Sequence, residues 1–134
     1  MLNHYYVMFF IMLASGLLST MNVWVDKYQD IRFSVNDLYM TLLMTGWMFT
    51  FMGLVYRDWN VLSFGLALVI LMIWCIRTQF LITQSQFLDG MIPHHSMAIH
   101  MSKQLLQKEN NIQSFLENII QVQGREISYM SINT

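Results

Sequence analysis

The chain has 134 residues, of which 55% are hydrophobic and only 11% are charged. Soluble domains carry about 25% charged residues, so this composition predicts a protein that contacts a lipid bilayer. The net charge of -1 excludes the broad basic surface that nucleic-acid binding needs, and we expect no nucleic-acid partner. Cys75 is the single cysteine, so the chain can form neither an intramolecular disulfide nor a thiolate metal cluster.

Three long apolar runs follow one another in the first part of the chain. Residues 5–25, 38–56 and 59–76 contain no Asp, Glu, Lys or Arg. Each run is close to the roughly 20 residues that a helix needs to cross a hydrocarbon core. We predict a multi-pass integral membrane protein with spans at about 5–25, 38–56 and 61–82. The first run has no basic leader and no small-x-small cleavage site, so we expect it to be retained.

The rest of the chain is more polar and shows helical periodicity twice, at about 84–107 and 111–131. We therefore divide the chain into a three-helix transmembrane region at 1–82 and an extramembrane helical hairpin at 83–134, an all-α organisation. Pro93 either starts a new helix or kinks a continuous one. A hairpin of this size buries too little to stand alone. We expect two copies to form a four-helix bundle, in a homodimer or higher oligomer.

Soft metal donors gather on one side of the first hairpin helix. At about 100° per residue, four of them share one arc. They are Met91, His94, His95 and Met101. Met97 lies at the edge of this arc and His100 points away from it, so both rank lower as ligands. Thioether sulfur binds Cu(I) or Ag(I), and imidazole suits both copper states. Copper, preferably as Cu(I), is therefore the predicted metal, and silver also fits.

One helix cannot hold a single ion with all four donors. Met91 can share an ion with His94 or His95, but His94 and Met101 are two turns apart, about 10 Å. Either two ions bind, or a facing subunit completes each site, and Ala98 at the centre of the arc leaves room for it. The alternative is a hydrogen-bonded histidine pair in an interface without metal. Because Met91 and Met101 lie on the same arc, metal binding and a metal-free histidine pair account for the pattern about equally well.

The second hairpin helix places two polar residues close to its apolar stripe. The stripe includes Leu116, Ile119 and Ile127, and the polar residues are Gln123 and Glu126. Polar groups near a buried seam need partners, and a histidine ring N–H is a plausible one. Gln123 and Glu126 are thus candidate supports for the metal ligands. Solvated edge positions are an equally good interpretation.

Two motifs of the tail resemble those of a known family. The segment 87–95, Phe-Leu-Asp-Gly-Met-Ile-Pro-His-His, is followed by Ala98 and Met101. It resembles the Met-Ile-Pro-His-His signature of the CopM-like domain-of-unknown-function family number three hundred and five. The segment 119–130 resembles the second motif of that family, an Ile-Ile pair followed by Gln, Glu-Ile and Met. Stretches at 32–40 and 77–79 resemble a membrane-anchored branch of the family.

The resemblance implies a ferritin-like four-helix bundle that binds copper or silver, generally outside the cytoplasm. Carried over to this chain, its ligands are Met91, His94, His95 and Met101. This chain holds one hairpin where soluble members hold two, which makes oligomerisation part of the expectation. The first predicted loop carries two basic residues, Lys27 and Arg32, and the second carries one, Arg57. The first loop and the tail lie on the same side of the membrane, so the positive-inside rule would place the tail inside. We follow the resemblance and expect the hairpin on the non-cytoplasmic side.

The leading hypothesis is a membrane-anchored protein that binds copper or silver for sequestration, resistance or transfer. It is not expected to be an enzyme, because no nucleophile–base pair, phosphate loop or paired carboxylates occur in the sequence. The alternative is a structural accessory or envelope subunit whose tail assembles with itself or other membrane proteins without metal. A Cu(I) channel or redox enzyme is a third possibility. It would need a protein-lined path along a ladder of methionines in the second span: Met40, Met44, Met48 and Met52.

Overall fold

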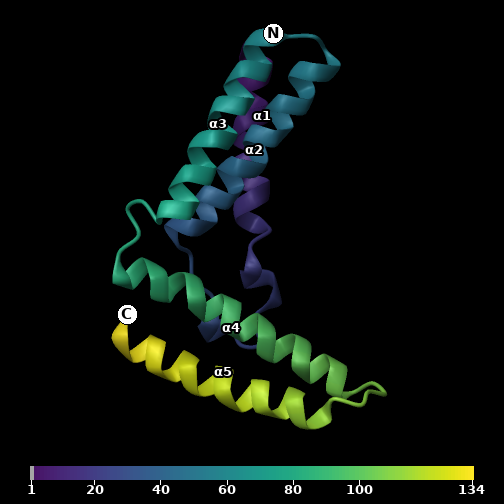
Figure 1. Cartoon of the computed structure of the whole chain (residues 1–134), viewed down its shortest axis with the longest axis vertical. Coiled ribbons are helices and arrows are strands. Elements are labelled where there is room, and N and C mark those ends of the chain that lie inside the picture. The colour runs from purple at the N-terminus through teal and green to yellow at the C-terminus, as the bar shows by residue number, and fades with distance from the viewer. Residues whose placement is uncertain (1) are drawn as a thin grey trace. The chain divides into compact units, whose positions relative to one another are not determined.

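The computed structural model describes residues 2–134, and this part of the chain is helical without any strand. Its helices are α1 (Leu2–Leu18), α2 (Val35–Val55), α3 (Trp59–Thr78), α4 (Gln84–Leu106) and α5 (Gln113–Asn133) (Figure 1). Two short 3-10 helices, η1 (Met21–Trp24) and η2 (Tyr28–Asp30), lie between α1 and α2. The chain forms two compact units. The apolar unit runs to Ser19 and resumes over Val35–Leu81, and the hairpin unit combines Thr20–Ser34 with Ile82–Thr134.

Three helical segments are long and apolar enough to span a membrane: Asn3–Trp24, Val35–Val55 and Trp59–Thr78. The prediction of three such helices is therefore confirmed. The last one ends at Thr78 instead of residue 82, because Gln79 adopts the left-handed conformation, with φ 53° and ψ 42°. Its backbone N–H caps the helix by bonding to the carbonyls of Cys75 and Ile76. This capping geometry is the usual way in which a helix ends.

The apolar unit is built on close backbone contact between α2 and α3. A Cβ atom at Gly65 would lie 2.4 Å from the Thr50 backbone nitrogen and 2.8 Å from the Gly46 carbonyl oxygen. At Gly46 it would lie 3.0 Å from the backbone nitrogen of Val69. Small residues that allow such an approach are typical of helix pairs in membranes, where burial from water drives no association. The two helices therefore depend on glycine for their contact.

The methionine ladder faces outward from the apolar unit. Met40 and Met44 are exposed at 57% and 46% within the chain, and Met48 and Met52 are half-buried. Phe49, between them in the sequence, is instead buried in the unit. This orientation favours methionines as flexible packing groups on the outer face of this unit.

In the hairpin unit, α4 and α5 run antiparallel and enclose a small apolar core (Figure 1). Its members are Leu88, Ile92, Ile99, Ile127 and Met130. Ile92 is fully buried, and the neighbouring Pro93 lies inside a single continuous helix. Of the two interpretations of Pro93, the start of a new helix is therefore wrong. Burial of the surrounding residues offsets the loss of one backbone hydrogen bond.

Residues 20–34 pack on α4 through a polar clasp centred on Ser96, whose side chain is fully buried. The Asp26 backbone N–H donates to Ser96 Oγ at 2.7 Å, and the Ser96 hydroxyl donates to Asp30 Oδ2 at 2.7 Å. Lys103 Nζ also lies 2.8 Å from Asp26 Oδ2. The sequence-based division at residue 82 counted this segment with the apolar region, because hydropathy does not register contacts between residues distant in sequence.

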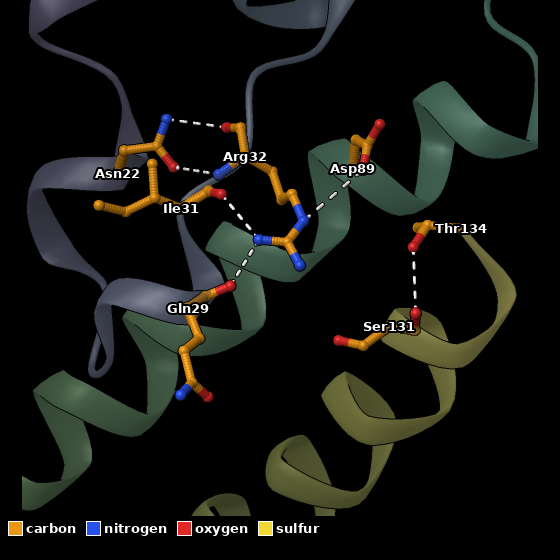
Figure 2. A network of polar contacts seen from close by, with 7 residues as sticks. All are labelled: Asn22, Gln29, Ile31, Arg32, Asp89, Ser131 and Thr134. Atoms are coloured by element: carbon orange, nitrogen blue, oxygen red, sulfur yellow. Dashed lines mark hydrogen bonds and ion pairs between the residues drawn. The ribbon is translucent and has the colours of Figure 1, made fainter.

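A second group of contacts joins the two ends of the segment at 20–34. Figure 2 shows that the Asn22 side chain brackets the Arg32 backbone, donating to its carbonyl at 2.8 Å and accepting from its N–H at 3.0 Å. The Arg32 guanidinium donates to the carbonyls of Gln29 and Ile31 and points toward Asp89 on α4, 3.9 Å away. The loop is thus ordered by polar contacts within itself as well as by the Ser96 clasp on α4.

Candidate metal centre

His95 is the most firmly oriented of the predicted ligands. Its Nδ1 lies 2.9 Å from the carbonyl oxygen of Met91, one turn earlier on α4. A carbonyl only accepts hydrogen bonds, so Nδ1 is the donor in this contact. The other ring nitrogen, Nε2, lies 2.6 Å from Glu126 Oε2 on α5. The histidine side chain is 12% exposed and the glutamate side chain 49%, so this pair lies at the edge of the hairpin core.

His94 adjoins this pair but remains open to solvent. Its ring centre lies 6.0 Å from that of His95, in an edge-to-face arrangement. Within residues 2–134 the His94 ring makes no hydrogen bond, and the residue is exposed. Both of its nitrogens are therefore free to bind another group.

The methionines of the predicted set lie apart. Met91 is half-buried and packs against the hairpin core, one turn before His95. Met101 is 50% exposed and lines a groove of about 570 Å³ together with Met97 and His100. The structure thus brings Met91, His94 and His95 into one region of α4, whereas Met101 joins the two residues that the helical arc ranked lower.

Of the two candidate supports on α5, only Glu126 reaches a histidine. Gln123 is half-buried and makes no hydrogen bond among the residues that the structure describes. Glu126 approaches His95 because α5 runs antiparallel to α4 in the hairpin. The second helix therefore contributes one carboxylate to the candidate site.

No group of three or more His, Cys, Asp or Glu side chains able to hold a metal ion occurs in residues 2–134. Methionine sulfur is outside this set of donors. A closed coordination shell around His94 and His95 therefore requires thioether sulfur, a second chain or both.

Two features of the hairpin unit were not predicted from the sequence. One is the Ser96 clasp, and the other is the position of Trp24, which lines the groove with Met97, His100 and Met101. A serine within the apolar face of a helix was the available signal, because a buried hydroxyl needs partners. Nothing in the spacing or hydropathy of the chain indicates that those partners come from the segment at 20–34.

Comparison with known proteins supports the family resemblance of the tail. Residues 81–132 match a family described as Domain of unknown function (DUF305). The chain is 40% identical over 125 residues to an uncharacterized protein of Acanthamoeba polyphaga mimivirus, and this match covers 88% of this chain and 82% of the viral protein. No solved structure matches the chain. The protein therefore belongs to the same family as this mimivirus protein, and its residues 81–132 carry the DUF305 domain.

Proposed function

We propose that this protein is a multi-pass membrane protein whose hairpin binds copper, preferably as Cu(I), for sequestration, resistance or transfer without catalytic turnover. Silver would occupy the same donors. The observation that carries the proposal is the contact between His95 Nδ1 and the Met91 carbonyl at 2.9 Å. Metal-binding histidines are commonly oriented in this way, since a carbonyl that holds one nitrogen leaves the other to face the metal.

The copper would lie between His95 Nε2, the free ring of His94 and the Met91 sulfur. These residues are at i, i+3 and i+4 on α4, so their side chains lie on neighbouring positions of the helix surface. Glu126 holds the His95 ring in place through Nε2. Copper bound at Nε2 would take the place of the proton in this hydrogen bond, which would be released to water. The carboxylate would then move aside or serve as an oxygen ligand, and in either position its charge would offset that of the ion.

A second copy of the hairpin completes the site in this proposal. His94 and Met101 are both exposed and seven residues apart, so they lie on one line along α4. Phe87 also lies on this line and is 49% exposed. Burial of its ring against a second copy would remove apolar surface from water and so stabilise the dimer. If two α4 helices pack antiparallel about a two-fold axis near Ala98, His94 of each lies opposite Met101 of the partner subunit. The result is a ferritin-like four-helix bundle with two equivalent copper sites.

The three helices of spanning length support anchorage in a lipid bilayer. In this proposal the copper site belongs to a membrane protein, where it can collect ions at the surface or pass them to other membrane proteins. We assign the hairpin to the non-cytoplasmic side on its resemblance to a family that generally acts there. Cysteine labelling of Thr134→Cys in sealed cells, with Cys75 replaced by alanine, tests this assignment.

Copper content and oligomeric mass measured on one sample of detergent-purified full-length protein test the proposal. We expect about two copper ions per dimer, and the loss of both in the double variant His94→Ala with His95→Ala. His4→Ala is the matched control, because it removes an exposed imidazole from α1 and should leave the copper content unchanged. Full copper binding by the double variant would refute the proposal.

A structural role without metal is favoured by one observation. Both nitrogens of His95 have partners within the chain, as in a histidine that serves only to join two helices. Under this alternative, the tail would clamp a protein partner. Assembly would then survive His94→Gln and Met91→Leu, whereas copper binding would not.

A further inference from the structure

A groove in the hairpin unit brings together soft donors, and the proposed function leaves two of them, Met97 and His100, unused. Met97 and His100 line it from α4, with Met101 beside them and Trp24 contributed by η1. All four residues belong to the unit formed by 20–34 and 82–134. Met97 and His100 are half-buried, and Trp24 and Met101 are each 50% exposed. An ion could therefore reach these side chains and still lose part of its water shell.

We propose that this groove is a second site for one soft monovalent cation, Cu(I) or Ag(I). The sulfurs of Met97 and Met101 and the imidazole of His100 are its ligands, and the indole of Trp24 lies against the ion. All of its ligands come from one chain, so it does not require a dimer. It shares Met101 with the dimeric copper site of the proposed function, and each Met101 sulfur can serve only one of the two sites at a time.

The helix spacing allows three donors to meet at one point. His100 and Met101 follow Met97 at i+3 and i+4, where Cβ atoms on a helix are about 5–6 Å apart. Methionine has three rotatable bonds before its methyl group, so its sulfur can move to suit the ion. The donors thus converge without any change in the backbone of α4.

The composition of the groove selects soft cations over hard ones. Its lining includes no Asp or Glu, and hard cations such as Ca²⁺ and Mg²⁺ require oxygen ligands. Thioether sulfur favours Cu(I), and a Trp ring attracts a cation that lies over its face. Lys108, the only charged residue of the lining, is exposed and can extend its ammonium group into water.

The state of His100 also distinguishes the groove from the region around His95. Both nitrogens of His95 are engaged, whereas the half-buried His100 ring makes no hydrogen bond within the part of the chain that the structure describes. A metal ion at His95 must displace Glu126 from Nε2, but His100 can bind one without breaking a contact. We therefore expect the groove to fill at lower metal concentration.

Silver titration of the full-length protein in detergent tests this proposal, since Ag(I) is a closed-shell substitute for Cu(I) that needs no reductant. The double variant His94→Ala with His95→Ala removes the histidines of the other site. We expect it to retain about one silver ion per chain. Adding Met97→Leu and His100→Leu to this background should weaken the remaining binding at least about tenfold, which corresponds to about 1.4 kcal/mol.

Trp24→Phe gives an independent readout. Silver should quench the fluorescence of the wild-type chain, and this quenching should be lost in the variant because the remaining tryptophans lie in the apolar unit. Loss of the indole should weaken binding about twofold to fivefold. The control is Met40→Leu, which removes an exposed thioether elsewhere. Helix content by circular dichroism confirms that each variant is folded.

The outcomes separate the two sites. Unchanged silver affinity in the Met97→Leu and His100→Leu background, or quenching that persists in Trp24→Phe, would overturn the groove proposal. If the His94 and His95 variant binds no silver, the groove proposal also fails and the other site stands. If that variant keeps all of its copper and silver while the Met97 and His100 substitutions abolish both, only the groove proposal stands.

Discussion

The two units of this protein satisfy their buried hydroxyl groups in different ways. In the apolar unit, Thr45 and Thr50 are buried, and each donates to a carbonyl one turn earlier in its own helix. In the hairpin unit, the buried hydroxyl of Ser96 joins Asp26 and Asp30, which are 70 and 66 residues away in sequence. The threonine bonds stay within one helix, so they do not determine which helices pair, and steric fit must do so. The Ser96 bonds instead determine that the segment at 20–34 packs on α4.

This difference follows from the surroundings of each unit. When nearly every side chain is apolar, burial does not distinguish one helix face from another, and close contact at glycine decides the pairing. In a polar unit with a small apolar core, a satisfied buried hydrogen bond adds specificity that hydrophobic burial lacks. Substitutions at the two kinds of contact should therefore differ in how much stability they remove and in how much of the chain they affect.

The largest effect is expected from Gly65→Ala in the apolar unit. The added Cβ would lie 2.4 Å from a backbone atom of Thr50, so α2 and α3 must move apart. Overpacking against backbone should destabilise this pair by about 3 kcal/mol, measured by denaturant unfolding in detergent. Gly124→Ala is the control, because its Cβ would be 4.0 Å from the nearest atom, Ile99 Cδ1. That change should stabilise α5 by about 0.5–1 kcal/mol, and equal losses in both variants would contradict the prediction.

A smaller and more local effect is expected from Ser96→Ala. It leaves the Asp26 N–H and the Asp30 carboxylate without their partner, at a cost of about 2 kcal/mol. Hydrogen–deuterium exchange should rise in residues 20–34 and stay unchanged in α2 and α3. Ser102→Ala is the matched control, since Ser102 is also buried on α4 but makes no hydrogen bond in residues 2–134. Equal exchange in the two variants would show that the clasp does not order the loop.

The smallest effect is expected from Asp89→Asn. Its contact with Arg32 is 3.9 Å long, and the two side chains are 23% and 33% exposed. Ion pairs of this kind contribute less than about 1 kcal/mol, and Asn22 still holds the Arg32 backbone. A double-mutant cycle with Arg32→Gln measures the pair directly. A coupling energy well above this limit would mean that the loop depends on charge and not on the Ser96 clasp.

Much of the candidate site could be predicted from spacing on one helix. The arc that placed Met91 beside His94 and His95 matches the region where the structure finds them, and Glu126 was singled out because it adjoins the apolar stripe of α5. The position of Met101 could not be predicted in the same way. A helical wheel treats α4 as isolated, so it gives no sign that residues 20–34 bring Trp24 to the side where Met97 and His100 lie.

The sequence by itself determined the number and order of the helices, because hydropathy and helical periodicity are local properties of the chain. It also determined which residues carry soft donors, since that depends only on side-chain chemistry. The tertiary structure decided that α4 continues through Pro93 and that residues 20–34 belong with the hairpin. Both depend on the free energy of burying and hydrogen-bonding groups that are distant in sequence, and these meet only when the chain has folded.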